Sequence, residues 1–361
     1  MRTVKKVVII CPYLFELHRG IERYCLSLAD ALVEKGIKVI IYCWGSSVNG
    51  ACGEINRKIK IRKVPNRRYY RDRIASLFYK LWLRIDNPDV TVLNFLYHGE
   101  EYLPADRPYC YVLHSPASQI PSRYEYVSKK LPRFSKLHVI AISKMVEDEA
   151  RPYIGGKPMT LVYNGTDTER FRPDAKAGSA KGKLRIISAA AFEERKGLHL
   201  MIEALGKLEE RDRITYDIYG GGNADYERRL DSLIKEHGLE KVVSLKGSVS
   251  NIADIMPGYD LFALPSKGEA FALSPIEAMA SGLPILVSDC PPYPEFVTPD
   301  FGFMADRDNP SDIGDIISAL LANPERLAQM KRASRQAALA YSWKKVVEKY
   351  LEVMNTLYTG F

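Results

Sequence analysis

Short, uninterrupted runs of apolar residues recur along this chain, and each of them ends in polar or glycine-rich residues. A strand that is buried on both faces of a parallel sheet reads this way, because neither of its faces needs polar residues for solvent. The stretches "KKVVIICPY" at 5–13 and "IKVIIYCW" at 37–44 are the first two such runs. The pattern predicts an α/β protein in which parallel strands alternate with helices.

The residues between these two runs, 20–36, have the spacing of a helix. Apolar side chains recur three or four positions apart, and the segment ends at Gly36, a residue type that commonly terminates helices. The residues on this apolar face are Ile21, Tyr24, Cys25, Leu28, Leu32 and Val33. Strand, helix and strand form a β-α-β unit, which joins parallel strands by a right-handed crossover.

One polar stretch divides this alternation. Residues 172–182 contain no large apolar residue and are interpreted as a linker, and the alternation restarts at 183. Because 361 residues exceed the usual size of a single core, two domains are expected. We predict two doubly wound, Rossmann-like domains at 1–171 and 183–341, followed by a terminal helix at 342–361. Ligands then bind at the carboxyl ends of the strands, in the cleft between the domains.

The cysteine and hydropathy patterns indicate the cellular compartment of the protein. Six cysteines are scattered singly without a C-x-x-C pair, which favours a reducing compartment, and no metal-ligand spacing occurs. There is no apolar run of 18 residues, so we expect no spanning helix. The first apolar run lacks a small-residue cleavage site and is interpreted as a strand rather than as a signal peptide. We therefore expect a cytoplasmic protein without a metal site.

Two glutamates lie in the stretch "KGEAFALSPIEAMASGLP" at 267–284. Glu277 completes the pattern Ser-Pro-Ile-Glu, which predicts a capping box that starts at Ser274. Glu269 lies in the loop between a strand and that helix, where a carboxylate is either solvated or placed for a ligand. The backbone N–H groups of Phe271, Ala272 and Leu273 come next, and an acceptor beside such donors suits a polyhydroxy ligand such as a sugar.

Other candidate site residues also follow strands. Arg195 and Lys196 in "EERKG" are either a solvated charge cluster or a pair of cations for a diphosphate. His114 ends the strand "YCYVLHS" and is either an ordinary polar residue or a group that faces the cleft. Gly20 opens the first helix. The stretch "YGGG" at 219–222 does not fit the G-x-G-x-x-G spacing of dinucleotide-binding proteins.

Several of these stretches, in this order, resemble glycosyltransferase family 4, a family with the GT-B fold. "PSKGEAFALSPIEAMASGLPIL" resembles its E-x7-E segment, and "ERKGLHLMIEAL" resembles its phosphate-binding segment. "RGIERYCLSLADALVEKGIKV" is similar to its first glycine loop and helix, while "YDIYGGG" and "VVSLKGSV" resemble its nucleotide-side loops. "YSWKKVVEKYLEVM" resembles the terminal helix that crosses back to the first domain. The likeness covers nearly the whole chain.

The resemblance implies transfer of a sugar, with retention, from a nucleotide-diphosphate sugar, which is a donor substrate rather than a cofactor. It implies that Glu269 and the N–H groups of Phe271 to Leu273 bind the donor sugar, and that Glu277 binds the ribose. Lys196 matches the diphosphate clamp, His114 matches a histidine near the reaction centre, and Gly220 lies in a nucleotide-side loop. A front-face substitution, in which the leaving phosphate oxygen accepts the acceptor's proton, is the implied mechanism.

The chain departs from the family pattern at two positions. An arginine that family members carry shortly after the strand is absent from "SAAAF", which leaves Arg195 as the second cation. Where the family has a Gly-Gly pair, this chain has Arg19 and Gly20, so that an arginine side chain either adds a phosphate contact or narrows the cleft.

Residues 55–84 form a basic segment with eleven Lys or Arg, one acid, Asp72, and interleaved aromatic residues such as Trp82. A solvated basic face, nucleic-acid binding, a phosphorylated acceptor and an anionic membrane surface are the alternatives. No nucleic-acid-binding module accompanies the segment. We favour contact of residues 57–84 with an anionic membrane surface, where the acceptor is a glycan or a lipid-linked molecule. His98 is a weaker candidate for the acceptor side.

One motif and three rival functions complete the sequence evidence. Asp306-Arg307-Asp308 has the D-x-D form of a metal site, but we interpret it as a surface loop outside any cluster of strand ends.

The rival functions are a sugar-nucleotide epimerase, a phosphorylase and a non-catalytic carbohydrate-binding protein on the same fold. No second phosphate or cofactor motif supports a phosphorylase, and the presence of Lys196, Glu269 and Glu277 together argues against a non-catalytic protein.

Overall fold

The computed structural model describes residues 3–14, 20–44, 55–64, 72–96, 99–174 and 182–360. The chain divides into two compact units: residues 1–165 together with 343–361 form unit 1, and residues 166–342 form unit 2. Unit 2 begins before the predicted linker because the residues ahead of that linker pack on it. The N–H of Thr166 donates to the carbonyl of Tyr341 at 2.8 Å, and Arg335 donates to the carbonyl of Thr168 at 3.1 Å.

Unit 1 contains a sheet of seven parallel strands in the order β3-β2-β1-β4-β5-β6-β7. The strands are β1 (Lys6–Ile10), β2 (Lys38–Trp44), β3 (Lys60–Val64), β4 (Val90–Leu93), β5 (Tyr109–Leu113), β6 (Leu137–Ala141) and β7 (Met159–Leu161). The strand order reverses between β1 and β4, which pair in register from Val7 opposite Val90 to Ile10 opposite Leu93. A reversal of this kind opens a crevice at the carboxyl ends of the strands.

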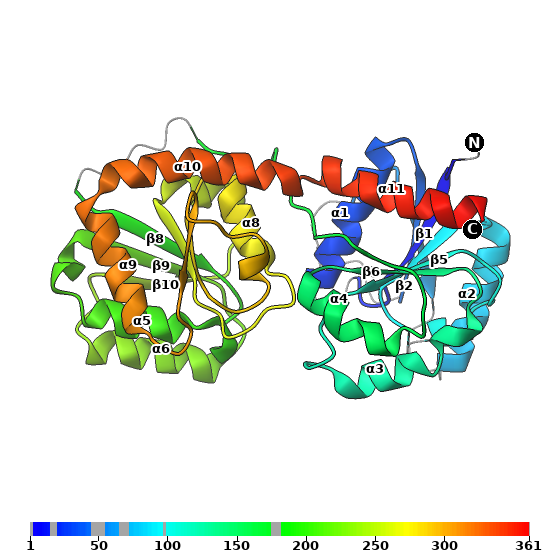
Figure 1. Ribbon diagram of the computed structural model, residues 1–361, viewed down its shortest axis with the longest axis horizontal. Helices are drawn as coiled ribbons and strands as arrows, with labels where there is room; N and C mark the ends of the chain where they lie inside the picture. The colour runs from blue at the N-terminus through cyan, green and yellow to red at the C-terminus, as the bar shows by residue number, and fades with distance from the viewer. Residues whose placement is uncertain are drawn as a thin grey trace. The chain divides into compact units, whose positions relative to one another are not determined.

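Helices cover both faces of this sheet, as right-handed crossovers require (Figure 1). They are α1 (Gly20–Glu34), α2 (Asp72–Asp86), α3 (Pro121–Ser128), α4 (Lys144–Ala150) and α11 (Trp343–Thr359). The terminal helix α11 packs on α1, where the Tyr24 hydroxyl donates to the Tyr350 hydroxyl at 2.8 Å. The predicted helix at 20–36 is confirmed as α1, and its apolar face buries Tyr24, Cys25, Leu28 and Leu32.

Unit 2 contains six parallel strands in the order β10-β9-β8-β11-β12-β13. The strands are β8 (Leu184–Ala189), β9 (Ile214–Tyr219), β10 (Val243–Gly247), β11 (Leu261–Leu264), β12 (Ile285–Ser288) and β13 (Gly302–Ala305). The helices are α5 (Leu198–Gly206), α6 (Ala224–Glu236), α7 (Ile252–Ile255), α8 (Leu273–Ala280), α9 (Ser311–Ala322) and α10 (Pro324–Ala338). The order reverses between β8 and β11, so the loops after these two strands are neighbours.

Two strands were missed in the sequence, each for a physical reason. β3 lies in the basic segment and forms the edge of its sheet, where exposed cations replace the apolar run of a buried strand. β13 is also an edge strand of four residues, one of which, Met304, is exposed. The apolar runs that predicted the central strands are confirmed, because those strands are buried on both faces. No helix within the described ranges is long and apolar enough to cross a membrane.

Candidate functional site

The loop after β8 presents both predicted cations of unit 2. Arg195 and Lys196 lie in a short 3-10 turn, Glu194–Lys196, and the next residue, Gly197, has a φ of 70° and precedes α5. A Cβ at Gly197 would lie 1.9 Å from the Pro265 carbonyl oxygen. Only glycine therefore allows this turn to approach the loop after β11 so closely. A backbone hydrogen bond of 2.8 Å from Lys267 N–H to the Arg195 carbonyl joins the two loops.

Glu269 lies in the loop after β11 and binds both cations. Its side chain is buried, with 7% of its surface exposed. Oε1 accepts hydrogen bonds from Lys196 Nζ at 2.5 Å and from Ser266 Oγ at 3.1 Å, and Oε2 accepts one from Arg195 at 3.1 Å. Burial opposes a charge on Arg195, but Glu269 and Glu193 outweigh it and raise the pKa of the guanidinium. Residues 74 positions apart in the sequence thus form one charged cluster.

The helix that follows Glu269 adds backbone donors to this cluster. α8 begins at Leu273, and the described residues provide no acceptor for the backbone N–H groups of Ala272 and Leu273. Unpaired N–H groups at a helix start, next to a carboxylate and two cations, suit a ligand with both hydroxyl and phosphate oxygens. Phe271 lies in the same loop and is buried.

The predicted capping box is wrong. The N-cap of α8 is Ala272, with no side-chain cap, and Ser274 lies inside the helix. The helix begins at Leu273, two residues before Pro275. Glu277 is in the second turn of α8 and is 5% exposed.

The backbone conformation of Gly220 and its close neighbours both require glycine at this position. Its φ is 152°, and a Cβ there would lie 1.8 Å from the Ala190 carbonyl oxygen at the end of β8. The Gly220 N–H also donates to the Gly247 carbonyl at 3.0 Å. Gly220 therefore lets the ends of β8, β9 and β10 converge at the carboxyl edge of the unit 2 sheet, next to the cation turn.

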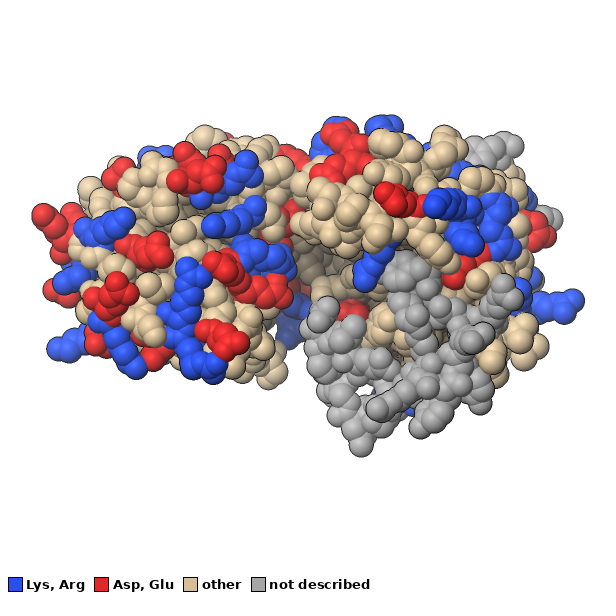
Figure 2. Space-filling view, turned by 90° about the horizontal axis from the view of Figure 1, so that it is seen from below, with Lys and Arg blue, Asp and Glu red and all other residues tan. Residues whose placement is uncertain are grey.

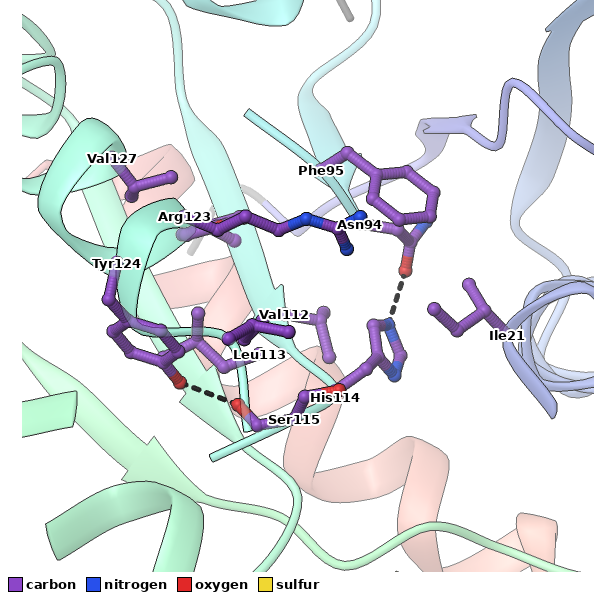
Figure 3. Close-up of a pocket in the computed structure, with 12 residues that line it drawn as sticks. Ile21, Asn94, Phe95, Val112, Leu113, His114, Ser115, Arg123, Tyr124 and Val127 are labelled. Atoms are coloured by element: carbon purple, nitrogen blue, oxygen red, sulfur yellow. Dashed lines mark hydrogen bonds between the residues drawn. The ribbon is translucent and has the colours of Figure 1, made fainter. Parts of the chain in front are cut away.

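In unit 1, His114 lines a cavity of about 60 Å³ at the carboxyl ends of β4 and β5. Figure 3 shows His114 beside Ile21 of α1 and hydrogen-bonded to Asn94, with Arg123 of α3 extending toward Asn94 from the other side. Asn94 Nδ2 donates to the Ile10 carbonyl at 3.0 Å, so its Oδ1 faces the histidine and accepts from Nε2 at 2.9 Å. This pair fixes the tautomer of His114 with the proton on Nε2.

Because of that tautomer, Nδ1 of His114 is a hydrogen-bond acceptor. Burial lowers the pKa of His114 to about 3, so the ring is neutral near pH 7. Among the described residues Nδ1 has no hydrogen-bond partner, and the ring packs edge-on against Tyr24 with centroids 4.8 Å apart. His114 can therefore accept a hydrogen bond from a ligand hydroxyl but cannot supply a positive charge.

The remaining predicted positions fall into three groups. Gly20 is the first residue of α1, and a side chain there would meet no atom within 4 Å. Arg19 and His98 lie outside the described residues. Asp306-Arg307-Asp308 is exposed as predicted, but it directly follows β13, so its placement away from strand ends is corrected. The described ranges contain no group of three or more acidic, histidine or cysteine side chains that fits a metal ion.

The basic segment is less uniformly exposed than its sequence indicates. Arg62 donates to Asp86 at 2.5 and 2.6 Å, and Lys60 forms an ion pair with the same carboxylate at 3.7 Å. Arg62 also lies over the Trp82 ring, 5.6 Å from its centroid. Part of the positive charge is therefore neutralised within unit 1. Arg67, Arg68 and Arg71 lie outside the described residues.

Two residues of the site were missed in the sequence. Asn94 follows a strand as His114 does, and that position at a strand's carboxyl end is the signal that identifies it. Ser266 is fully buried, and its hydroxyl holds Glu269, but nothing in "LPSKGE" distinguishes it from a turn serine. Its role depends on a contact that only the folded loop creates.

Two family models match consecutive parts of the chain. The family model described as "Glycosyltransferase Family 4" matches residues 18–170, and the one described as "Glycosyl transferases group 1" matches residues 169–337. The lipopolysaccharide core biosynthesis mannosyltransferase LpsB of Rhizobium meliloti is 26% identical over 217 residues, which are 55% of this chain and 62% of LpsB. The aligned part thus spans less than two thirds of that relative.

Solved structures share the fold over almost the full length. Sucrose-phosphate synthase from Thermosynechococcus elongatus has a TM-score of 0.82 at 18% identity, covering 96% of this chain and 97% of its own. Anabaena HepE, solved with UDP and glucose, has a TM-score of 0.77 at 18% identity, covering 96% and 98%. With two parallel-sheet units and family models that run from residue 18 to 337, this chain belongs to glycosyltransferase family 4 and has the GT-B fold.

Proposed function

We propose that this chain is a retaining, metal-independent glycosyltransferase that moves a hexose from a nucleoside-diphosphate sugar to a glycan or lipid-linked acceptor. The observation that carries this proposal is the cluster in which buried Glu269 binds Lys196 and Arg195 beside the start of α8. We expect UDP as the nucleotide and cell-envelope polysaccharide or lipopolysaccharide as the product. LpsB acts in lipopolysaccharide core synthesis, and HepE binds UDP, which supports these expectations.

In this proposal unit 2 binds the donor. Lys196 and Arg195 pair with the diphosphate, and the N–H groups of Ala272 and Leu273 add donors at the start of α8. Glu269 accepts hydrogen bonds from hydroxyls of the donor sugar while it still holds Lys196. Glu277 binds the ribose hydroxyls. The two cations stabilise the negative charge that develops on the leaving diphosphate, which is the largest contribution expected in such a reaction.

The transfer breaks the bond between the anomeric carbon and the phosphate oxygen and forms a bond from that carbon to an acceptor oxygen. The acceptor's proton passes to the leaving phosphate oxygen on the same face of the sugar. Unit 1 supplies His114, which is neutral and accepts a hydrogen bond from a sugar hydroxyl at Nδ1. Asn94 keeps that nitrogen unprotonated, so we assign Asn94 a positioning role.

Metal independence is proposed because the two cations supply the positive charge that a divalent ion supplies elsewhere. The carboxylates of the D-x-D stretch are engaged locally: Asp306 Oδ1 accepts from the Asp308 N–H at 2.8 Å, and Asp308 pairs with Arg307 at 3.9 Å.

We further propose a cytoplasmic protein that docks on an anionic membrane surface through basic residues 57–84. The five described cysteines are buried and form no disulfide with one another, which is consistent with a reducing compartment. Arg57, Lys58, Lys63 and Arg84 are exposed cations of this segment.

A panel of nucleotide sugars tests the function. A bound donor at 100 times its dissociation constant should stabilise the protein by about 2.7 kcal/mol, and the correct donor should slowly release free nucleoside diphosphate. NMR of the transferred sugar should show the donor's anomeric configuration. A donor that stabilises the protein but yields neither diphosphate nor transfer would favour a non-catalytic carbohydrate-binding protein. Conversion of the nucleotide sugar into its epimer would favour an epimerase.

A further inference from the structure

The helix α2 carries an apolar stripe that faces solvent. Seven large hydrophobic side chains are exposed among the described residues, and four of them are on α2. They are Ile74, Leu77, Leu81 and Ile85, with exposed fractions of 37%, 60%, 51% and 60%. Their spacing of three, four and four residues places them on one face of the helix.

The opposite face of α2 already anchors the helix to unit 1. Ala75, Tyr79 and Leu83 are buried there, and the Tyr79 ring stacks on Tyr42 with an angle of 6° between the rings. At the end of the helix, Asp86 accepts hydrogen bonds from Arg62 and Tyr42. The stripe is therefore a second apolar face that folding does not bury.

Cations border this stripe. Lys80 and Arg84 precede Leu81 and Ile85 by one position each, so both lie on the same side of the stripe. Residues 55–64 and 72–86 contain two acids, Asp72 and Asp86. Asp86 is buried and forms an ion pair with Arg62.

The surface of unit 2 is organised differently. In Figure 2 positive and negative side chains alternate over the face of unit 2 in view. On α6, Arg228 pairs with Asp225, and Lys235 pairs with Asp231 at 2.6 Å. Among the described residues, α2 carries four of the exposed large hydrophobic side chains, whereas these charges of α6 are paired within the helix.

We infer that α2 inserts its apolar stripe, Ile74, Leu77, Leu81 and Ile85, among the acyl chains of an anionic lipid surface. An apolar face bordered by Lys and Arg is the pattern of a helix that lies in the membrane interface. A second copy of this chain fits less well, because a symmetric contact would bring the same cations together. The inference rests on the proposed contact with an anionic surface and names the element that penetrates it.

The direction in which α2 runs places one end of its apolar stripe toward the site proposed for the reaction. Its last residue, Asp86, accepts through its carbonyl from Lys6 Nζ at 2.7 Å, at the amino end of β1. The first turn of α2 therefore points toward the carboxyl edge of the sheet, where His114 lines its cavity. A lipid-linked acceptor held at the Ile74 end would present its head group to that edge.

Vesicle sedimentation tests the stripe separately from the charges. Wild type should bind vesicles of phosphatidylcholine and phosphatidylglycerol at 70:30, and part of the binding should persist at about 0.5 M salt, where charges are screened within a few ångströms. The double variant Leu77→Gln/Leu81→Gln should bind about tenfold more weakly or worse, because each leucine loses its transfer to an apolar phase. Lys80→Ser/Arg84→Ser should lose mainly the salt-sensitive part. Met304→Gln, which removes an exposed apolar side chain of unit 2, is the matched control and should bind like wild type.

Fluorescence measures the depth of insertion. Trp82 is on α2, whereas Trp44 and Trp343 are only 2% and 8% exposed. Lipids brominated on the acyl chain should quench wild type, and Trp82→Phe should remove most of that quenching. Absence of quenching, or equal binding by wild type and the double leucine variant, would overturn insertion. Insertion would also be overturned if wild type were a dimer that binds no vesicles and the leucine variant were a monomer.

Donor hydrolysis without vesicles should be the same in wild type and the leucine variant. Normal vesicle binding by a protein that hydrolyses no donor would refute the proposed transfer but leave the lipid contact intact.

Discussion

Glu269→Gln separates the contacts that this carboxylate makes in the fold from its proposed role in the reaction. In the ligand-free protein Glu269 balances the charges of Lys196 and Arg195, and in the proposed reaction it also binds the donor sugar. Glutamine keeps the size of the side chain and one acceptor oxygen but removes the negative charge. The variant should therefore change folding stability, nucleotide affinity and transfer by different amounts.

The magnitudes follow from the exposure of each partner. The Lys196 side chain is 13% exposed, and its contact with Glu269 is 2.5 Å, so loss of the charge should destabilise the fold by about 2–3 kcal/mol. Half of the Arg195 side chain is exposed, so its contact should add at most about 1 kcal/mol. A bound diphosphate supplies new negative charge to both cations. The affinity for free UDP should therefore stay the same or rise by up to about tenfold, while transfer should fall about 100-fold.

Urea unfolding with and without UDP, together with UDP titration and turnover, measures all three quantities. Glu277→Gln is the matched control: it is equally buried but proposed to hold the ribose, so it should weaken UDP binding. The reasoning fails if Glu269→Gln unfolds within about 0.5 kcal/mol of wild type, or if it weakens UDP binding as much as it weakens transfer.

Four further predictions follow from the structure. Lys196→Ala should lower turnover by about 100-fold or more, and wild-type turnover would remove its role at the diphosphate. The pKa of His114 is about 3 in the folded protein and about 6.5 in the unfolded chain, so between pH 7 and pH 5 only the unfolded chain gains the proton. The wild-type free energy of unfolding therefore decreases as the pH is lowered over this range, and His114→Gln should make that decrease smaller by about 2 kcal/mol. An unchanged pH dependence would contradict that assignment. Ser274→Ala should change the free energy of unfolding by less than about 0.5 kcal/mol, whereas a true N-cap serine would cost about 1 kcal/mol. Turnover should survive a metal chelator, and a loss that manganese restores would show that a divalent ion takes part.

The sequence was most informative where burial was complete. Runs such as "KKVVIICPY" identify central strands because both faces of such a strand are covered, so every side chain must be apolar. β3 carries exposed cations, and β13 is an apolar run of only four residues, so neither sequence stands out as a strand. The start of α8 was misplaced because Ser274 has the right residue type for an N-cap, whereas the helix begins one residue earlier, after Ala272.

For the site, the sequence by itself supplied the ordered motifs and the positions after strand ends, which are enough to select Arg195, Lys196, Glu269 and His114. The tertiary structure decided what these residues do to one another. The reversal of strand order between β8 and β11 brings Glu269 against the two cations, and Asn94 selects the tautomer of His114 from a neighbouring strand. The exposed stripe on α2 is likewise a tertiary result, because a helix with apolar residues on several faces does not reveal which face the sheet covers. Contacts between distant segments depend on strand order and packing, and local sequence carries neither.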